Sequence, residues 1–160
     1  DGYVLASKDR EELQEYACHT GMPIRITPHP VQSLTSQPYK VLTSCIHSKE
    51  RHEEYRRSLE PWARDKLSLF FSSEYYLEHV PLGVSKGSAI TFLCSYLGVP
   101  IENTVAAGDA ENDISMLKTA KVGAAMANGT LQVKEAADYV TVSDNNQGGI
   151  AEIIQNFIEN

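Results

Sequence analysis

The sequence lacks the features that mark membrane, secreted and repeat proteins. No apolar run in its 160 residues approaches the roughly 18 residues that a membrane-spanning helix needs. The first residues contain no basic segment followed by an apolar one, so we expect no signal peptide. Neither an internal repeat nor a low-complexity tract occurs. These absences predict a globular protein that does not engage a membrane.

Cysteine is also scarce. Cys18, Cys45 and Cys94 are odd in number and far apart, a pattern that favours free thiols in a reducing cytoplasm over a disulfide framework or a zinc site. The histidines lack the spacing of metal ligands. We therefore expect ordinary loop and surface side chains at His19, His29, His47, His52 and His79.

Positive charge is in deficit. The chain has 14 Lys and Arg against 21 Asp and Glu, a net charge of −7 at pH 7, which argues against broad nucleic-acid binding because the phosphate backbone demands a basic surface. A small phosphate ester is not excluded, since it needs only a local positive pocket. The 42% apolar and 22% charged residues are typical of a soluble globular protein, long enough for one core or two small lobes.

The hydrophobic pattern changes near Pro81-Leu82-Gly83, where we place a boundary between domains 1–82 and 83–160. The first domain mixes helices with runs of paired strands, which predicts an α+β lobe. A proline-punctuated loop is expected between its first helix and its first strand. The elements predicted here are a helix over 9–19, strands over 40–46, 67–71 and 75–80, and a helix that Ser48 caps and that runs to about Ala63.

Residues 83–160 alternate regularly between helix and strand. This alternation is typical of a parallel sheet covered on both faces, so the predicted fold class is α/β. Only about three strands are visible, whereas an open α/β domain usually has more. The elements predicted here are helices over 86–97, 111–119, 131–137 and 149–158 and strands over 104–107, 122–126 and 139–142.

An acidic cluster follows the first of these strands. The strand should end at Gly108, which places Asp109 at the carboxyl edge of the sheet, where ligands bind in open α/β folds. Asp109 and Asp113 are four residues apart, so both carboxylates can lie on one face of the next helix's first turn, with Asn112 beside them. Mg²⁺ takes one or two carboxylates and keeps several waters. The alternative is that Asp109 only caps the helix while Glu111 and Asp113 complement its dipole.

Lys86 gives a second indication. It opens the helix over 86–97, where the helix dipole favours an anion rather than a cation. A phosphoryl group sharing the site would explain a lysine at this position. The alternative is a solvated surface side chain, which is the usual state of an isolated lysine.

Four segments follow one another in the second domain: 84–87 (VSKG), 106–117 (AAGDAENDISML), 122–128 (VGAAMAN) and 133–141 (VKEAADYVT). Together they resemble the third and fourth motifs, and the sequence after them, of the Cof-type phosphatases of the haloacid dehalogenase (HAD) superfamily. The resemblance covers residues 83–158, about half of the chain, with the motifs in the family's order. It implies a partial HAD-type Rossmann-like core in 83–160 and part of an α+β cap domain in 1–82.

The resemblance also implies a Mg²⁺-dependent phosphatase acting on a small phosphorylated metabolite, such as a sugar phosphate or a phosphorylated cofactor. In that family an N-terminal aspartate attacks the phosphoryl group, and a second aspartate acts as acid and base while water hydrolyses the aspartyl-phosphate. By position, Lys86 would pair with the phosphoryl oxygens and the nucleophile, and Asn112 would hydrogen-bond phosphate. Asp109 would ligate Mg²⁺, and Asp113 would hold the water shell of the metal. Lys86 and Asp113 are thus the predicted catalytic residues, and Asp109 and Asp113 the predicted metal site.

Two departures from the family pattern matter. The nucleophile motif Asp-x-Asp-Gly-Thr occurs nowhere in the sequence, and no Ser or Thr phosphate site precedes Lys86. We therefore expect a preceding segment of the same protein, about a hundred residues long, to supply both, and this chain alone to be inactive. Residues 127–129 (ANG) stand where the family often has Gly-Asn-Ala. Residues 147–150 (QGGI) lack the acidic residue that the family often has before the last glycine. Both differences bear on loop geometry.

A non-catalytic binding or regulatory module on a phosphatase-like scaffold is the main rival, because fold does not fix function. A phosphomutase is a further alternative, distinguished by whether phosphate is released or moved within the substrate. The coding sequence upstream of Asp1 separates enzyme from module. An Asp-x-Asp-Gly-Thr-like stretch there favours the enzyme, and a start codon at Asp1 favours the module.

Overall fold

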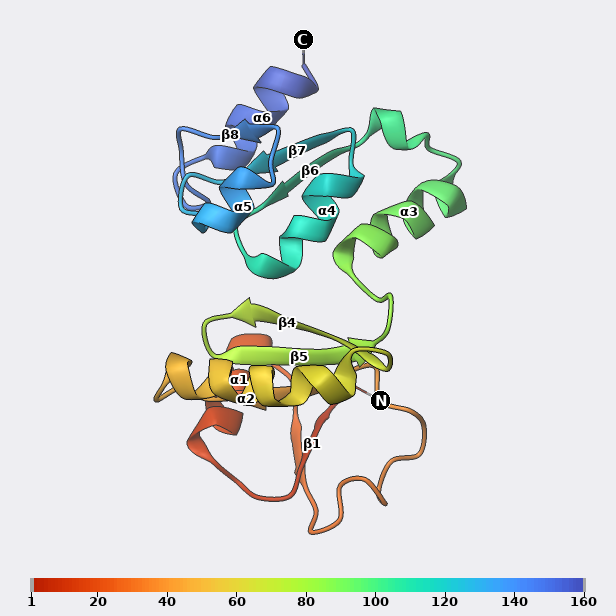
Figure 1. Ribbon diagram of the computed structural model, residues 1–160, viewed down its shortest axis with the longest axis vertical. Helices are drawn as coiled ribbons and strands as arrows, with labels where there is room; N and C mark the ends of the chain where they lie inside the picture. The colour runs from red at the N-terminus through yellow and green to blue at the C-terminus, as the bar shows by residue number, and fades with distance from the viewer. Residues whose placement is uncertain (1, 160) are drawn as a thin grey trace.

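The computed structural model describes residues 2–159, with an N-terminal part (residues 2–82) below a C-terminal part (residues 83–159) in Figure 1. The elements of the N-terminal part are β1 (Val4–Ala6), α1 (Glu11–Thr20), β2 (Ile24–Ile26), β3 (Val41–Ser44), α2 (Lys49–Ala63), β4 (Leu67–Ser73) and β5 (Tyr76–Pro81). Those of the C-terminal part are α3 (Lys86–Leu97), η1 (Ile101–Asn103), β6 (Val105–Gly108), η2 (Glu111–Asp113), α4 (Ile114–Thr119), β7 (Val122–Ala125), α5 (Leu131–Glu135), β8 (Tyr139–Val140) and α6 (Gly149–Phe157).

The main sheet of the N-terminal part is antiparallel, with strand order β3-β5-β4. α2 lies against β4. The side chain of Ser48 accepts the backbone N–H of Arg51 at 3.2 Å, satisfying one of the free donors at the start of α2. The predicted Ser48 cap is therefore confirmed.

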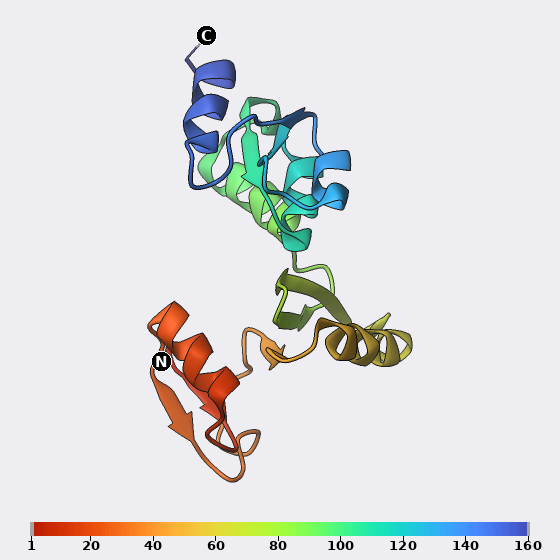
Figure 2. The same ribbon diagram turned by 90° about the vertical axis from the view of Figure 1, so that its left-hand side faces the viewer.

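The prediction of an irregular segment before residue 40 was wrong in part, because β1 and β2 form a small parallel pair there. α1 connects the two strands, and the unit lies beside the rest of the N-terminal part in Figure 2. Both strands are three residues long and none of their residues is fully buried. Three residues are too few to establish an alternation of apolar and polar side chains, so the pattern did not predict these strands.

Two histidines expected at the surface lie in the layer between α2 and the sheet. His52 is 3% exposed and His79 is 7% exposed. Each has one ring nitrogen within hydrogen-bond distance of a partner, Thr43 Oγ1 for His52 and the Val41 carbonyl for His79, both at 3.1 Å. The ring of His52 also meets Phe71 edge-on, with centroids 5.1 Å apart. These contacts offset part of the cost of burying the two side chains, for which the expectation of a surface position was wrong.

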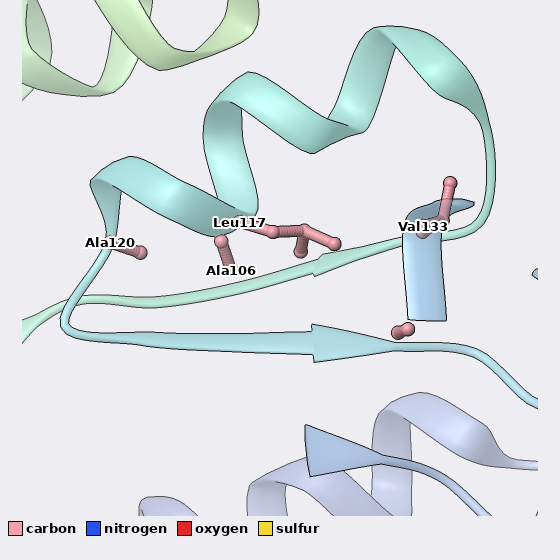
Figure 3. Packing of buried hydrophobic residues seen from close by; sticks show 5 residues of the cluster. Ala106, Leu117, Ala120 and Val133 are labelled. Carbon is pink, nitrogen blue, oxygen red and sulfur yellow. The ribbon is translucent and has the colours of Figure 1, made fainter. Parts of the chain in front are cut away.

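The C-terminal part is an α/β layer with a parallel sheet of order β6-β7-β8. Ala106 of β6 packs with Leu117 of α4 and Val133 of α5 on one face of this sheet (Figure 3). Ala124 of β7 packs with Ile153 of α6 on the other face. Neighbouring strand residues point to opposite faces, so both faces are covered. The predicted α/β fold is confirmed.

The connection from β5 to α3 passes through the predicted domain boundary. Gly83 adopts a positive φ of 82° in this turn, a conformation that glycine reaches without steric cost. Ser85 then caps α3, its side chain accepting the N–H of Ser88 at 3.0 Å. This cap fixes where α3 begins and places Lys86 in its first turn, as expected.

Candidate functional site

The acidic loop, residues 109–113, begins where β6 ends, at the carboxyl edge of the parallel sheet. Asp113 is only 4% exposed, and its Oδ2 accepts the backbone N–H groups of Asp109 and Ala110, each at 3.0 Å. These bonds hold residues 111–113 in a 3₁₀ turn, so α4 starts only at Ile114. The helix predicted over 111–119 is thus present with a 3₁₀ first turn. The expectation that Asp109 and Asp113 share a helical face was wrong, because Asp109 precedes this segment and Asp113 accepts its backbone N–H.

Lys86 and Asp113 meet at this edge although 27 residues separate them. The Lys86 Nζ donates to Asp113 Oδ1, with the lysine side chain half exposed and the carboxylate buried. Beside them α3 and α4 approach closely, and the Gly87 N–H donates to Ser115 Oγ at 3.1 Å. Asp113 is therefore an anion that offsets the unfavourable position of a lysine at a helix start.

Asp109 has two partners that the sequence did not indicate. Asn128 Nδ2 donates to Asp109 Oδ2 at 2.8 Å, and Asn145 Nδ2 approaches the same oxygen at 3.4 Å. The backbone N–H of Asn145 also donates to Asn128 Oδ1 at 3.0 Å. Only the position of Asn128, after β7 and at the same sheet edge, could have been noticed in the sequence. Nothing in the pattern marked Asn145.

Asn112 lies within the acidic loop, between the two aspartates. Its Oδ1 is buried and has no hydrogen-bond partner within residues 2–159. A buried amide oxygen without a partner carries a desolvation cost. Of the four predicted site residues, Lys86 and Asp113 are in contact, and Asp109 and Asn112 lie on the same loop as Asp113, while their individual roles stay predictions.

The donor set fits Mg²⁺ through Asp109. Among residues 2–159, every hydrogen bond to the Asp109 carboxylate reaches Oδ2, which leaves Oδ1 available to a cation. Both oxygens of Asp113 already accept hydrogen bonds, so that carboxylate suits contact through a metal-bound water. No group of three or more His, Cys, Asp or Glu side chains in the described chain is arranged to hold a metal. These residues would therefore hold Mg²⁺ only together with further ligands.

One ion pair joins the N-terminal part to this loop. Arg56 of α2 contacts both carboxylate oxygens of Glu111, at 3.0 and 3.2 Å. The guanidinium also donates to Glu60 and lies over the Phe71 ring, 5.6 Å from its centroid. β4 lies against η2 at the same place. The acidic loop is thus in contact with both parts of the chain.

Two further observations concern the rest of the molecule. A cavity of about 390 Å³ lies between β1, α1 and β3, lined by residues such as Lys8, Arg10 and Ser44, and is separate from the acidic loop. No helix within residues 2–159 has the length and apolar character required to cross a membrane.

Comparison with known proteins identifies the family. Residues 1–154 match the family model described as haloacid dehalogenase-like hydrolase. The chain belongs to this family. The membership predicted from the four sequence segments is therefore confirmed. A haloacid dehalogenase-like hydrolase from Bacteroides thetaiotaomicron has the same fold, with a TM-score of 0.79 and 31% identity over 96% of this chain and 57% of that one.

Two curated relatives show how varied the names among similar proteins are. A 5-amino-6-(5-phospho-D-ribitylamino)uracil phosphatase of Bacillus subtilis is 38% identical over 106 residues, 66% of this chain and 40% of that protein. A protein of Arabidopsis thaliana named as a chloroplastic endoribonuclease is 40% identical over 93 residues, 58% of this chain and 16% of that protein. The haloacid dehalogenase-like chain thus spans less than half the length of these two relatives.

Proposed function

We propose that the protein containing this chain is a Mg²⁺-dependent phosphatase that hydrolyses small phosphate monoesters. The observation that carries the proposal is the contact of the Lys86 ammonium with the Asp113 carboxylate, which also accepts the backbone N–H of Asp109, at one sheet edge. Phosphoryl transfer depends mostly on positioning and on neutralising charge, which a fixed lysine and a divalent cation supply. Membership of a hydrolase family supports the same proposal.

Each residue has a proposed task. Asp109 holds the cation through Oδ1, and Mg²⁺ supplies neutralisation of the phosphoryl charge when bound. Asp113 orients the Lys86 ammonium and accepts hydrogen bonds from the metal's water shell. The exposed half of the Lys86 side chain allows its ammonium to contact a phosphoryl oxygen as well. Asn112 binds the phosphate.

The nucleophile is proposed to come from another segment of the same protein. No Asp-x-Asp-Gly-Thr motif occurs in these 160 residues. β6 lies at the edge of its sheet, beside Asp109, so a further strand there would end at the same rim. An aspartate on that strand would attack phosphorus and form an aspartyl-phosphate, which water then hydrolyses.

The proposed substrate class is a small phosphorylated metabolite. The Bacillus subtilis relative is named for a phosphate ester on a ribityl chain, which is a small monoester of this kind. A nucleic-acid substrate is disfavoured by the net charge of −7. The N-terminal part, in contact with the acidic loop through Arg56, would act as the cap that excludes water and selects the leaving group.

Replacing Asp109 tests the proposal. In the complete natural protein, Asp109→Asn removes the carboxylate but keeps the shape of the side chain, so Mg²⁺-dependent turnover of an aryl phosphate should fall to background. Glu102→Gln is the matched control, because it makes the same chemical change at an exposed position in η1, before the opposite end of β6. Full activity of Asp109→Asn would refute the proposal.

The 160-residue chain alone should be inactive, because it lacks the proposed nucleophile and offers only part of a metal site. Aryl phosphate turnover by this chain, measured after removal of contaminating phosphatases and compared with its Asp109→Asn variant, tests this. Turnover that disappears in the variant would show that the chain contains a complete catalytic centre.

A non-catalytic binding or regulatory module is the second candidate, favoured by the lack of a nucleophile motif in this sequence. A natural protein that binds a phosphate monoester without releasing phosphate would be such a module. We also propose a cytoplasmic location, which the three unpaired cysteines support.

A further inference from the structure

Three successive strands each deliver one polar side chain to the same point on the sheet edge. Asp109 follows β6 directly, Asn128 comes three residues after the end of β7, and Asn145 comes five residues after the end of β8. Because the strands are parallel, their carboxyl ends meet at one rim. Side chains from two of these connections thus converge on the carboxylate that follows β6.

The orientation of the Asn128 amide is determined by its neighbours. Its Oδ1 accepts the backbone N–H of Asn145 at 3.0 Å, so its NH₂ group must face Asp109, where it donates to Oδ2 at 2.8 Å. Asn145 Nδ2 donates to the same oxygen at 3.4 Å. Both amides therefore engage one oxygen of Asp109 and restrict the rotation of its carboxylate.

The connection that carries Asn145 is itself anchored. Glu152 of α6 accepts the backbone N–H groups of Val142 and Ser143, at 3.0 and 3.1 Å. The buried Thr141 accepts the N–H of Ala127 at 3.0 Å and so ties this connection to the one that carries Asn128. The two asparagines are therefore presented by a common, hydrogen-bonded framework.

We propose that Asn128 and Asn145 are positioning residues that fix the Asp109 carboxylate so that its Oδ1 faces a divalent cation. The proposal rests on the proposed function, because it assigns the metal to Asp109. Hydrogen bonds to a metal-ligating carboxylate orient it, and their loss typically weakens metal binding about 10- to 100-fold. Two neutral amides are suited to this, since they hold one oxygen without adding a charge that would repel the cation.

The deciding variant is Asn128→Ala in the complete natural protein. Alanine removes the NH₂ group that donates to Asp109 Oδ2 and the oxygen that accepts the Asn145 N–H, and it adds no charge beside the proposed metal ligand. Mn²⁺ binding without substrate, measured by electron paramagnetic resonance, should weaken about 10- to 100-fold. Asn103→Ala makes the same truncation at an exposed position in η1 and should bind Mn²⁺ like the wild type.

Asn145→Ala provides an independent measurement if Asn128→Ala does not fold. It should weaken Mn²⁺ binding and raise the Mg²⁺ concentration for half-maximal activity, while KM for the aryl phosphate at saturating Mg²⁺ stays constant. A loss of thermal stability with unchanged Mn²⁺ affinity would indicate a merely structural role and would overturn the proposal.

The two proposals fail in different ways. A wild-type protein that hydrolyses the aryl phosphate with Mg²⁺, together with asparagine variants of unchanged Mn²⁺ affinity, refutes the positioning role and leaves the phosphatase intact. A wild-type protein that binds Mn²⁺ in an Asn128-dependent way but releases no phosphate refutes the phosphatase and supports the positioning role. A wild-type protein that binds no Mn²⁺ overturns both.

Discussion

His52 places a ring nitrogen in the apolar layer between α2 and the antiparallel sheet. Its Nδ1 is buried and has no hydrogen-bond partner within residues 2–159. Burial, and after it the nearby His79, lowers the pKa of His52 from its ordinary value of 6.5, while Glu53 opposes this effect. Below pH 6.5 the unfolded chain therefore binds a proton more readily at this position than the folded chain does.

This difference predicts that stability decreases as the pH falls. Stability rises with pH wherever the unfolded state binds more protons, so the His52 contribution is complete above 6.5 and is lost below it, by at most about 1.4 kcal/mol per pH unit. Urea unfolding between about pH 7.5 and about pH 5.5 measures this slope. His52→Gln should reduce it, and His29→Gln, at an exposed position, should leave it unchanged. Equal slopes in all three proteins would contradict the prediction.

The hydrogen-bond partners of some site residues can be predicted from the sequence, and those of others cannot. Lys86 and Asp113 follow from local rules, since each lies beside the start of a helix at the carboxyl edge of a parallel sheet. No local rule of this kind predicts the position of Asn145. It lies 36 residues from Asp109, and its place depends on how Glu152 anchors the connection after β8. Contacts that depend on the path of a long connection cannot be derived from residue spacing alone.

At the level of elements, the crossing of α3 and α4 depends on Gly87. A Cβ at this position would lie 2.5 Å from the Ser115 carbonyl oxygen and 2.7 Å from Thr119 Oγ1. The first of these atoms belongs to the backbone of α4, so the helix itself would have to shift. Close packing of the two helices thus requires a residue without a side chain.

Gly87→Ala should therefore destabilise the protein, although alanine is the better helix former. Intrinsic propensity favours alanine by about 1 kcal/mol, but forcing α3 away from α4 should lower the free energy of unfolding by about 1–3 kcal/mol. Ser95→Ala, at an exposed position of the same helix, should stabilise by a few tenths of a kcal/mol. Chemical denaturation measures both changes, and a gain in stability for Gly87→Ala would contradict this account of the crossing.

The elements that sequence patterns predicted best are those with clear boundary residues or an uninterrupted apolar run. α3 was predicted with the bounds that it has, because Ser85 marks its start and Gly98, with a φ of 66°, marks its end. β6 and β7 are short apolar runs between helices and were also predicted. β1 and β2 were missed because their stability comes from pairing with each other and not from a buried face. Whether such short strands form depends on tertiary contacts and not on the local sequence.

For the whole molecule, the relation between the two parts depends on Arg56. Among residues 2–159, its pair with Glu111 is the only ion pair between the N-terminal and C-terminal parts. The two side chains are 25% and 41% exposed, so the pair contributes little to stability. Its effect should instead be on the orientation of the N-terminal part over the acidic loop.

Arg56→Met should separate these two effects. The free energy of unfolding should change by less than about 1 kcal/mol. The radius of gyration of the chain, from small-angle X-ray scattering, should increase because the two parts are no longer held together at this point. Lys49→Met breaks a comparable pair with Glu74 inside the N-terminal part and should leave the radius unchanged. An unchanged radius in Arg56→Met would show that β4 and η2 hold the parts together without the ion pair.

β6 has one long side that faces no other strand within residues 2–159. Its amide and carbonyl groups there can bond to any extended backbone at roughly 4.7–4.9 Å, whatever the sequence of the incoming chain. The concentration at which this chain is handled therefore matters. Without a strand bound at this edge, raising the protein concentration should cause copies of the chain to pair edge to edge and form oligomers. A strand bound there should keep the chain monomeric.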